Sequence, residues 1–132
     1  RWVSADEMAA RLNQAGVDRA RGFSLNTTNY YSTDEEIGYG EAISGLTNGA
    51  HYVIDTSRNG AGPAPEHPLS WCNPAGRALG TPPTTDTAGA HADAYLWVKR
   101  VGESDGSCDH GDPAAGTFVS QFVIDLARNS GR

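Results

Sequence analysis

The stretch HYVIDT, residues 51–56, is the segment that decides the fold. Its apolar and β-branched residues are typical of a buried strand, and Asn48-Gly49 places a turn directly before it. Two further strands are expected on either side of it along the chain, RGFSLN at 21–26 and AYLWV at 94–98. The last of these is mostly apolar, as a strand covered on both faces would be.

Helices are expected before, between and after these strands. Ser4 and Glu7 form a capping box, and apolar residues then recur at helical spacing until Gly16. Thr33 and Glu36 form a second capping box, which predicts a helix over residues 34–46. A final helix is expected over residues 116–129, with an apolar stripe made of Phe118, Phe122, Ile124 and Leu126.

The expected order is helix, strand, helix, strand, long loop, strand, loop, helix. Alternation of this kind is typical of parallel strands with helical crossovers, so the predicted fold class is α/β. Three strands cannot close a barrel, and no strand precedes the first helix, so we expect part of a larger sheet. The long loop over residues 57–91 holds six of the seven prolines, and so long an irregular stretch is usually functional or disordered.

The charge balance excludes some partners. Ten Lys and Arg residues against sixteen Asp and Glu residues give a formal net charge of −6. No block of basic residues is present, which argues against a nucleic acid or an anionic membrane as partner. No apolar run is long enough for a transmembrane helix, and we expect no cofactor.

The two cysteines, Cys72 and Cys108, favour a disulfide over two buried free thiols. A disulfide indicates an oxidising compartment and therefore a secreted, extracellular protein. A zinc site would need more ligands at closer spacing, and none of the four histidines pairs with these cysteines. The segment 109–112 holds two aspartates and a histidine without the alternating spacing of a calcium loop. We therefore expect no metal.

Polar residues follow all three expected strands, at the ends where parallel α/β folds bind ligands. They are Asn26 and Asn29, then Asp55, Arg58 and Asn59, then Lys99, Glu103 and Asp105. Each group has a structural alternative: an Asx turn for the asparagines, a loop cap or ion pair for Asp55, and a solvated salt bridge for the last group. Three such clusters in succession favour a binding or active site.

The tryptophans differ in their surroundings. Trp71 lies in the proline-rich loop, where an exposed aromatic ring would suit stacking against the apolar face of a sugar. Trp97 lies inside an expected strand and is expected in the core, and Trp2 has no clear assignment.

Several strings of residues resemble family 6 of the glycoside hydrolases, which are cellulases that invert the anomeric centre. They run in order over nearly the whole chain, and are NTTNYY at 26–31, VIDTSRNG at 53–60, WCNPAGRALG at 71–80, DAYLWVK at 93–99, GESDG at 102–106 and AGTF at 115–118. The resemblance implies that residues 1–132 are the C-terminal half of a catalytic domain. That domain would be a distorted TIM-type barrel with its substrate groove across the carboxyl ends of the strands.

The resemblance also implies roles for particular residues. Cys72 and Cys108 would be bridged. Asp105 matches the aspartate usually proposed as catalytic base, and Arg58 the arginine that sets the electrostatics of the catalytic carboxylates. The substrate-binding residues would be Trp71, which stacks a glucosyl unit, Lys99, Glu103, and Asn26 or Asn29.

An inverting glycosidase needs a protonated carboxyl as general acid as well as a base. In the family the acid lies upstream of the matched region, so the expected partners are a β-1,4-glucan and the N-terminal half of the same domain. The short segment after Asp105 resembles that of open-groove endoglucanases and predicts cleavage of internal bonds. The alternatives are a glucan-binding fragment without catalysis and an isolated fragment without activity.

Overall fold

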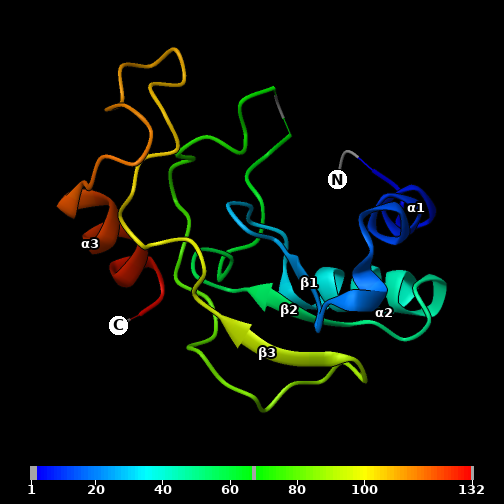
Figure 1. The fold of residues 1–132 in the computed structure, drawn as a ribbon. Helices are drawn as coiled ribbons and strands as arrows, with labels where there is room; N and C mark the ends of the chain where they lie inside the picture. Colours follow the sequence, from blue (N-terminus) through cyan, green and yellow to red (C-terminus); the bar gives the residue numbers. More distant parts are fainter. Residues whose placement is uncertain (1–2, 67, 132) are drawn as a thin grey trace.

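The computed structural model describes residues 3–66 and 68–131. Its elements are, in chain order, helix α1 (Ala5–Ala15), the short 3₁₀ turn η1 (Val17–Arg19), strand β1 (Gly22–Leu25), helix α2 (Thr33–Leu46), strand β2 (His51–Asp55), strand β3 (Ala92–Leu96) and helix α3 (Ser120–Asn129). The strands form one parallel sheet in the order β1-β2-β3 (Figure 1). The α/β class with parallel strands is confirmed.

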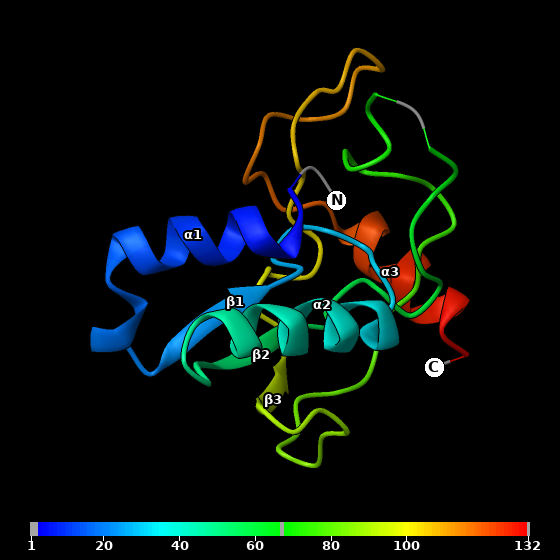
Figure 2. The same cartoon turned by 90° about the vertical axis from the view of Figure 1, so that its right-hand side faces the viewer.

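The core lies where α1 and α2 cover one face of the sheet (Figure 2). Ile43 of α2 and Ile54 of β2 are fully buried and belong to the same apolar cluster as Tyr52. A Cβ atom at Gly40 would come within 2.6 Å of the Tyr52 ring, so this glycine lets α2 approach β2 closely. Helix α3 lies apart from α1 and α2, beyond the carboxyl ends of the strands (Figure 1).

The helix caps follow the sequence closely. Ser4 Oγ accepts a hydrogen bond from Glu7 N, and α1 ends at Gly16 in the left-handed conformation, as expected. The second capping box was placed one residue too late, because Ser32 and Glu35 form it rather than Thr33 and Glu36. Both pairs have the required spacing, but Ser32 has the extended backbone of a cap, whereas Thr33 already belongs to the helix.

Three other sequence predictions need correction. β3 begins two residues earlier than predicted, and α3 begins at Ser120 rather than near 116. Trp97 therefore lies beyond the strand and not in the core. It is partly exposed, and its Nε1–H donates to the Thr81 carbonyl. Of the predicted apolar stripe, Leu126 is buried, but Phe118 is 64% exposed and precedes the helix. Trp2 and His67 lie outside the described residues.

The sheet is open along both edges in the part of the chain that the structure describes. β1 and β3 each pair in parallel only with β2, and the far side of β3 adds one isolated antiparallel bridge between Thr84 and Tyr95. Among the described residues, no helix is long and apolar enough to cross a membrane.

The amino-terminal edge of the sheet carries a network of ion pairs and hydrogen bonds. Asp93 pairs with His51 at 2.6 Å and with Arg21 at 3.1 Å. Glu41 of α2 pairs with His91 at 2.6 Å and accepts a hydrogen bond from the Tyr52 hydroxyl at 2.9 Å. The network therefore ties α2 to the start of β2 and to the residue before β3.

This network makes stability depend on pH. Burial raises the pKa of Glu41, but hydrogen bonds from His91 and Tyr52 outweigh it and hold that pKa below its ordinary value of 4.5. A carboxyl whose pKa is lower in the folded state stabilises the fold above its unfolded pKa, and this contribution is lost as the pH falls through the folded pKa.

We therefore expect Glu41→Gln to lower the free energy of unfolding near neutral pH and to have a diminishing effect as the pH falls below about 4.5, where the unfolded carboxyl is already protonated. Urea denaturation of both proteins at a series of pH values measures this difference. A difference that stays constant down to the lowest pH would show that the ionised carboxylate contributes nothing.

Candidate active site

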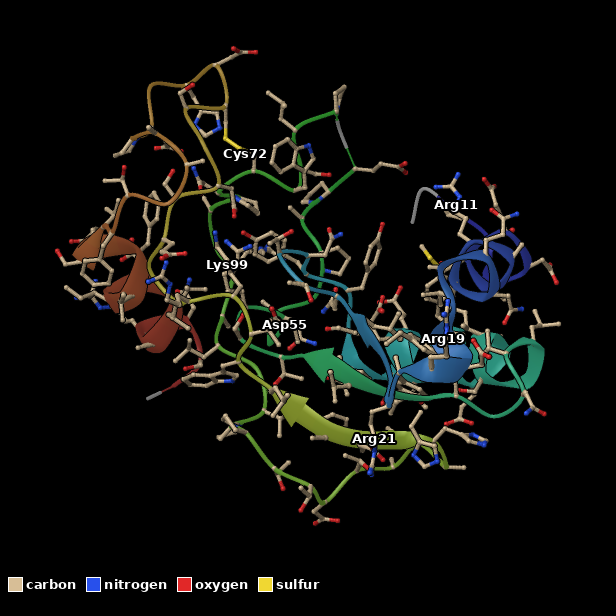
Figure 3. The ribbon with its side chains drawn as sticks, viewed as in Figure 1. Arg11, Arg19, Arg21, Asp55, Cys72 and Lys99 are labelled. Carbon is tan, nitrogen blue, oxygen red and sulfur yellow. A yellow bond between two sulfur atoms is a disulfide. The ribbon has the colours of Figure 1, made fainter. Side chains whose placement is uncertain are left out.

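The carboxyl ends of the three strands bring together loops that lie far apart in the sequence. Asp55, the last residue of β2, accepts hydrogen bonds from Ser57 N at 2.9 Å through Oδ1 and from Lys99 N at 2.9 Å through Oδ2. Figure 3 shows Asp55 and Lys99 close together at this end of the sheet. Asp55 therefore fixes the segments after β2 and β3 relative to each other, which is a structural role of the loop-capping kind.

Asp105 lies at the centre of the polar cluster, with its side chain 4% exposed. Its Oδ2 atom accepts hydrogen bonds from Arg58 Nη1 at 2.8 Å, from the Tyr30 hydroxyl at 3.1 Å and from Asn73 N at 3.1 Å. Its Oδ1 atom lies 3.3 Å from the Lys99 ammonium nitrogen. The carboxylate thus meets two cations and two neutral donors.

The surroundings of Asp105 keep it ionised. Burial by itself raises the pKa of a carboxyl group, because it penalises the charged form. The hydrogen bond and the charge of Arg58, together with the Asn73 amide and the charge of Lys99, outweigh burial and hold the pKa of Asp105 below its ordinary value. Asp105 therefore carries a fixed negative charge at neutral pH.

Arg58 is held as firmly as the carboxylate that it pairs with. Its side chain is 5% exposed, its Nη2 donates to the Thr28 carbonyl at 2.9 Å, and its guanidinium carbon lies 4.5 Å from the centre of the Tyr30 ring. Burial raises the pKa of Tyr30 well above its ordinary value, so this hydroxyl stays protonated and donates to Asp105. Arg58 Nε is buried without a hydrogen-bond partner among the described residues.

Lys99 and Glu103 complete the cluster on one side. Lys99 Nζ lies 3.9 Å from Glu103 Oε2, and Arg100 Nη2 lies 2.5 Å from Glu103 Oε1. The side chains of Lys99 and Glu103 are 12% and 14% exposed. Glu103 is thus an ion-paired carboxylate, with Lys99 and Arg100 as its cations.

An open hollow of about 750 Å³ adjoins the cluster, between the loop over residues 69–77 and α3. Its lining includes Tyr30, Arg58, Asn73 and Glu103, so four groups around Asp105 face this space. The hollow is the place where a ligand would reach the cluster.

Among the described residues, the two asparagines after β1, Asn26 and Asn29, form no hydrogen bond with Asp105, and they differ in the hydrogen bonds of their side chains. The Asn26 side chain accepts from Tyr31 N and donates to the carbonyls of Tyr31 and Asp55, so its amide is used to hold the loop. The Asn29 side chain makes no hydrogen bond within the described part of the chain. Both line a separate hollow of about 280 Å³ near the start of α1.

Trp71 is 38% exposed on the loop that also carries Cys72. Cys72 and Cys108 form a disulfide, with their Cα atoms 6.1 Å apart, which confirms the predicted pairing. Cys108, His110 and Asp112 lie close enough to suggest metal ligands, but the Cys108 sulfur is already used in the disulfide. Figure 3 shows the disulfide at Cys72, farther from the sheet than Lys99.

Sequence reasoning missed two residues of the cluster, Tyr30 and Asn73. Tyr30 lies inside the string NTTNYY and Asn73 inside WCNPAGRALG, so both belong to segments already singled out. Neither residue is ionised at neutral pH, and only the folded structure shows that both donate to Asp105.

The amino-acid sequence is similar to those of known proteins. The family described as Glycosyl hydrolases family 6 matches residues 2–130. Endoglucanase A from Cellulomonas fimi is 48% identical over 130 residues, which cover 98% of this chain and 28% of that protein. Endoglucanase 1 from Streptomyces halstedii is 43% identical over 132 residues, which cover 96% of this chain and 38% of that protein.

Solved structures agree with the sequence comparison. The endoglucanase Cel6 from Mycobacterium tuberculosis, in complex with methyl-cellobiosyl-4-deoxy-4-thio-β-D-cellobioside, matches with a TM-score of 0.99 and 77% identity over 100% of this chain and 45% of that chain. Endoglucanase Cel6B from Humicola insolens matches with a TM-score of 0.77 and 33% identity over 95% and 42%. The chain therefore spans less than half the length of these relatives.

The disulfide is expected to contribute strongly to stability, because it closes a loop between residues 36 apart in the sequence. The chain-entropy model gives about 4 kcal/mol for a loop of this length. Replacing both cysteines with serine should lower the free energy of unfolding by roughly that amount, as measured by urea denaturation. A decrease in the free energy of unfolding below about 1 kcal/mol would mean that other contacts hold the two loops together. The wild-type protein with its disulfide reduced serves as the control.

Proposed function

Because the chain belongs to family 6 of the glycosyl hydrolases, we propose that it is the C-terminal half of the catalytic domain of an inverting endo-1,4-β-glucanase. The substrate is a β-1,4-glucan such as cellulose, and the partner is the N-terminal half of the same domain. The observation that carries this proposal is the buried, ionised Asp105, held by Arg58 and Lys99 at the carboxyl ends of parallel strands.

Asp105 has the properties of one of the two catalytic carboxyl groups. An inverting glycosidase needs one carboxylate that stays charged and one carboxylic acid that donates a proton to the leaving oxygen. Asp105 is the charged one and acts as the catalytic base. Three donors already occupy Oδ2, so an attacking water would engage Oδ1, beside Lys99.

The low pKa of Asp105 limits how well it removes a proton. A weaker base contributes less by general base catalysis, but a permanent buried charge stabilises the positive charge that develops on the sugar ring. Both contributions lower the same barrier, and both are lost when the carboxylate is neutralised.

Several features support a second half outside this chain. Among the described residues, the outer edge of β1 is unpaired and the outer edge of β3 carries one isolated bridge. The chain spans 28% to 45% of the relatives described above, and Arg58 Nε is a buried donor without an acceptor in the described structure. A buried donor left unpaired costs about 1–3 kcal/mol, which an acceptor from the N-terminal half would recover. The general acid would come from the same half.

We assign substrate contacts to residues near the carboxyl ends of the strands, of which Glu103 lines the larger hollow. Trp71 is exposed enough to stack on a glucosyl ring, and Lys99 and Glu103 offer a donor and an acceptor beside Asp105. Asn29, whose side-chain amide has no hydrogen-bond partner among residues 3–66 and 68–131, can bind a sugar hydroxyl, whereas Asn26 acts through the loop that it holds. Only fourteen residues separate Asp105 from α3, which suits an open groove and internal cleavage. The disulfide suits a secreted protein.

One observation favours a second candidate function. Both carboxylates of the cluster, Asp105 and Glu103, are already ion-paired, and in our proposal the general acid comes from the N-terminal half rather than from this chain. A chain that acts alone would therefore bind glucan through Trp71 without cleaving it. Binding without hydrolysis even after the N-terminal half is supplied would favour this alternative.

Asp105→Asn in the reconstituted domain should lower kcat at least about a hundredfold, because it removes the buried charge, while substrate binding changes only a few-fold. Release of reducing ends and loss of viscosity from a soluble cellulose derivative measure turnover and internal cleavage. Early NMR spectra of the product should show the α-anomer first, as inversion requires. Asp18→Asn, on the exposed turn η1, is the matched control. Unchanged turnover in Asp105→Asn would remove Asp105 from the catalytic residues.

Trp71→Ala should mainly weaken binding, because stacking acts on the bound sugar as much as on the transition state. We expect about a tenfold loss of affinity for a cello-oligosaccharide, or about 1.4 kcal/mol, measured by titration calorimetry. Trp97→Ala, at a partly exposed tryptophan whose indole N–H donates to the Thr81 carbonyl, should leave affinity unchanged. Equal affinity in wild type and Trp71→Ala would return Trp71 to a structural role.

A further inference from the structure

Asn73 makes several hydrogen bonds with the loop that carries Asp105. Its backbone N–H donates to Asp105 Oδ2 at 3.1 Å, and its Oδ1 accepts from Asp105 N at 2.7 Å. The two bonds form a reciprocal pair, one to the carboxylate and one to the backbone of the same aspartate. Asn73 therefore contacts both the side chain and the backbone of Asp105, whereas Arg58, Tyr30 and Lys99 contact its carboxylate.

The side-chain amide of Asn73 holds the residues on both sides of Asp105 as well. Asn73 Nδ2 lies 3.1 Å from Ser104 Oγ, 2.9 Å from the Gly106 carbonyl and 3.0 Å from Asp112 Oδ2. Ser104 is itself fully buried and bonds to the Pro113 carbonyl. The loop that carries Asp105 is thus fixed around one amide group.

Asn73 belongs to a different loop from the residues that it holds. It follows Cys72 directly and lies two residues after Trp71, whereas Asp105 is 32 residues further along the chain. The disulfide to Cys108 joins the same two loops, but it reaches the chain three residues after Asp105. Of these two ties, only Asn73 contacts the carboxylate itself.

The backbone of Asn73 explains why asparagine suits this position. Its φ angle is +42°, in the left-handed region that asparagine, aspartate and glycine tolerate best. Among these three, only asparagine also offers both an acceptor for Asp105 N and a donor for the carbonyl and carboxylate around it.

We propose that Asn73 is a positioning residue, which holds the Asp105 carboxylate in a fixed place relative to the sugar-stacking Trp71. This inference rests on the proposed function, since it takes Asp105 as a catalytic carboxylate and Trp71 as a substrate contact. Loss of the Asn73 side chain would let the loop over residues 104–106 move, and the hydrogen bond from Asn73 N to Asp105 would weaken with it. Asp105 would then be easier to protonate and less well placed.

The first test is Asn73→Gly, because glycine keeps the left-handed backbone and removes only the side chain. The pKa of Asp105, followed by carbon-13 NMR of its carboxyl group in protein that contains the whole chain, should rise toward its ordinary value. In the reconstituted domain, kcat should fall about tenfold to a hundredfold, the size of effect that a misplacement of about 1 Å produces, with KM little changed. Asn48→Gly is the matched control, since Asn48 is also left-handed but is exposed in a turn.

Asn73→Asp is a second variant that keeps the acceptor for Asp105 N and replaces the donor with a negative charge. It should raise the pKa of Asp105 more than Asn73→Gly does, because a like charge beside a carboxylate favours protonation. An unchanged pKa in both variants, or a fall in stability with kcat preserved, would overturn the proposal and leave Asn73 a structural residue. The NMR titration does not depend on turnover, so the two proposals can fail separately. A reconstituted wild-type domain without activity would contradict the proposed function, and the pKa of Asp105 in the two variants would still test the role of Asn73.

Discussion

The buried ion pair between Arg58 and Asp105 is the interaction on which the arrangement of the site depends. Removing two charges from water costs several kcal/mol per ion, so such a pair persists only where further hydrogen bonds complete it. Here Tyr30, Asn73 and Lys99 complete the carboxylate, and the Thr28 carbonyl and the Tyr30 ring complete the guanidinium. The cluster contributes more to the position of Asp105 than to the stability of the fold.

The parallel sheet is what allows these residues to meet. Tyr30 follows β1, Arg58 follows β2, and Lys99 and Asp105 follow β3, so each strand delivers a part of the cluster to the same edge. Asn73 comes from the long loop between β2 and β3, which the disulfide fastens to the segment after Asp105. The described residues of that loop form no helix or strand, and the contacts of Asn73 with Asp105 hold this part of the loop beside the cluster.

Much of this could be predicted from the sequence, and the limits have physical causes. HYVIDT lies in a buried central strand because its pattern and its flanking turn agree. The shift of β3 and the exposure of Trp97 arise because an apolar run does not mark where strand pairing ends. The polar residues at the strand ends correctly indicated the cluster. The sequence did not separate the roles of Asn26, which holds a loop, and Asn73, which holds a carboxylate. Those roles depend on contacts between residues 29 to 39 positions apart, which no local pattern encodes.

An unpaired donor in the cluster supports our proposal that the site is shared with another part of the protein. The buried charges balance, because Arg58 and Lys99 face Asp105 and Glu103, whereas Arg100 is 83% exposed to solvent. Arg58 Nε, however, is buried without an acceptor among the described residues, which favours an acceptor such as a carboxylate from outside them. An inverting mechanism requires a second carboxyl group about 6.5–9.5 Å from the first, with room for a water between them. The proposed N-terminal half would meet both requirements, since it would supply that acceptor and the general acid.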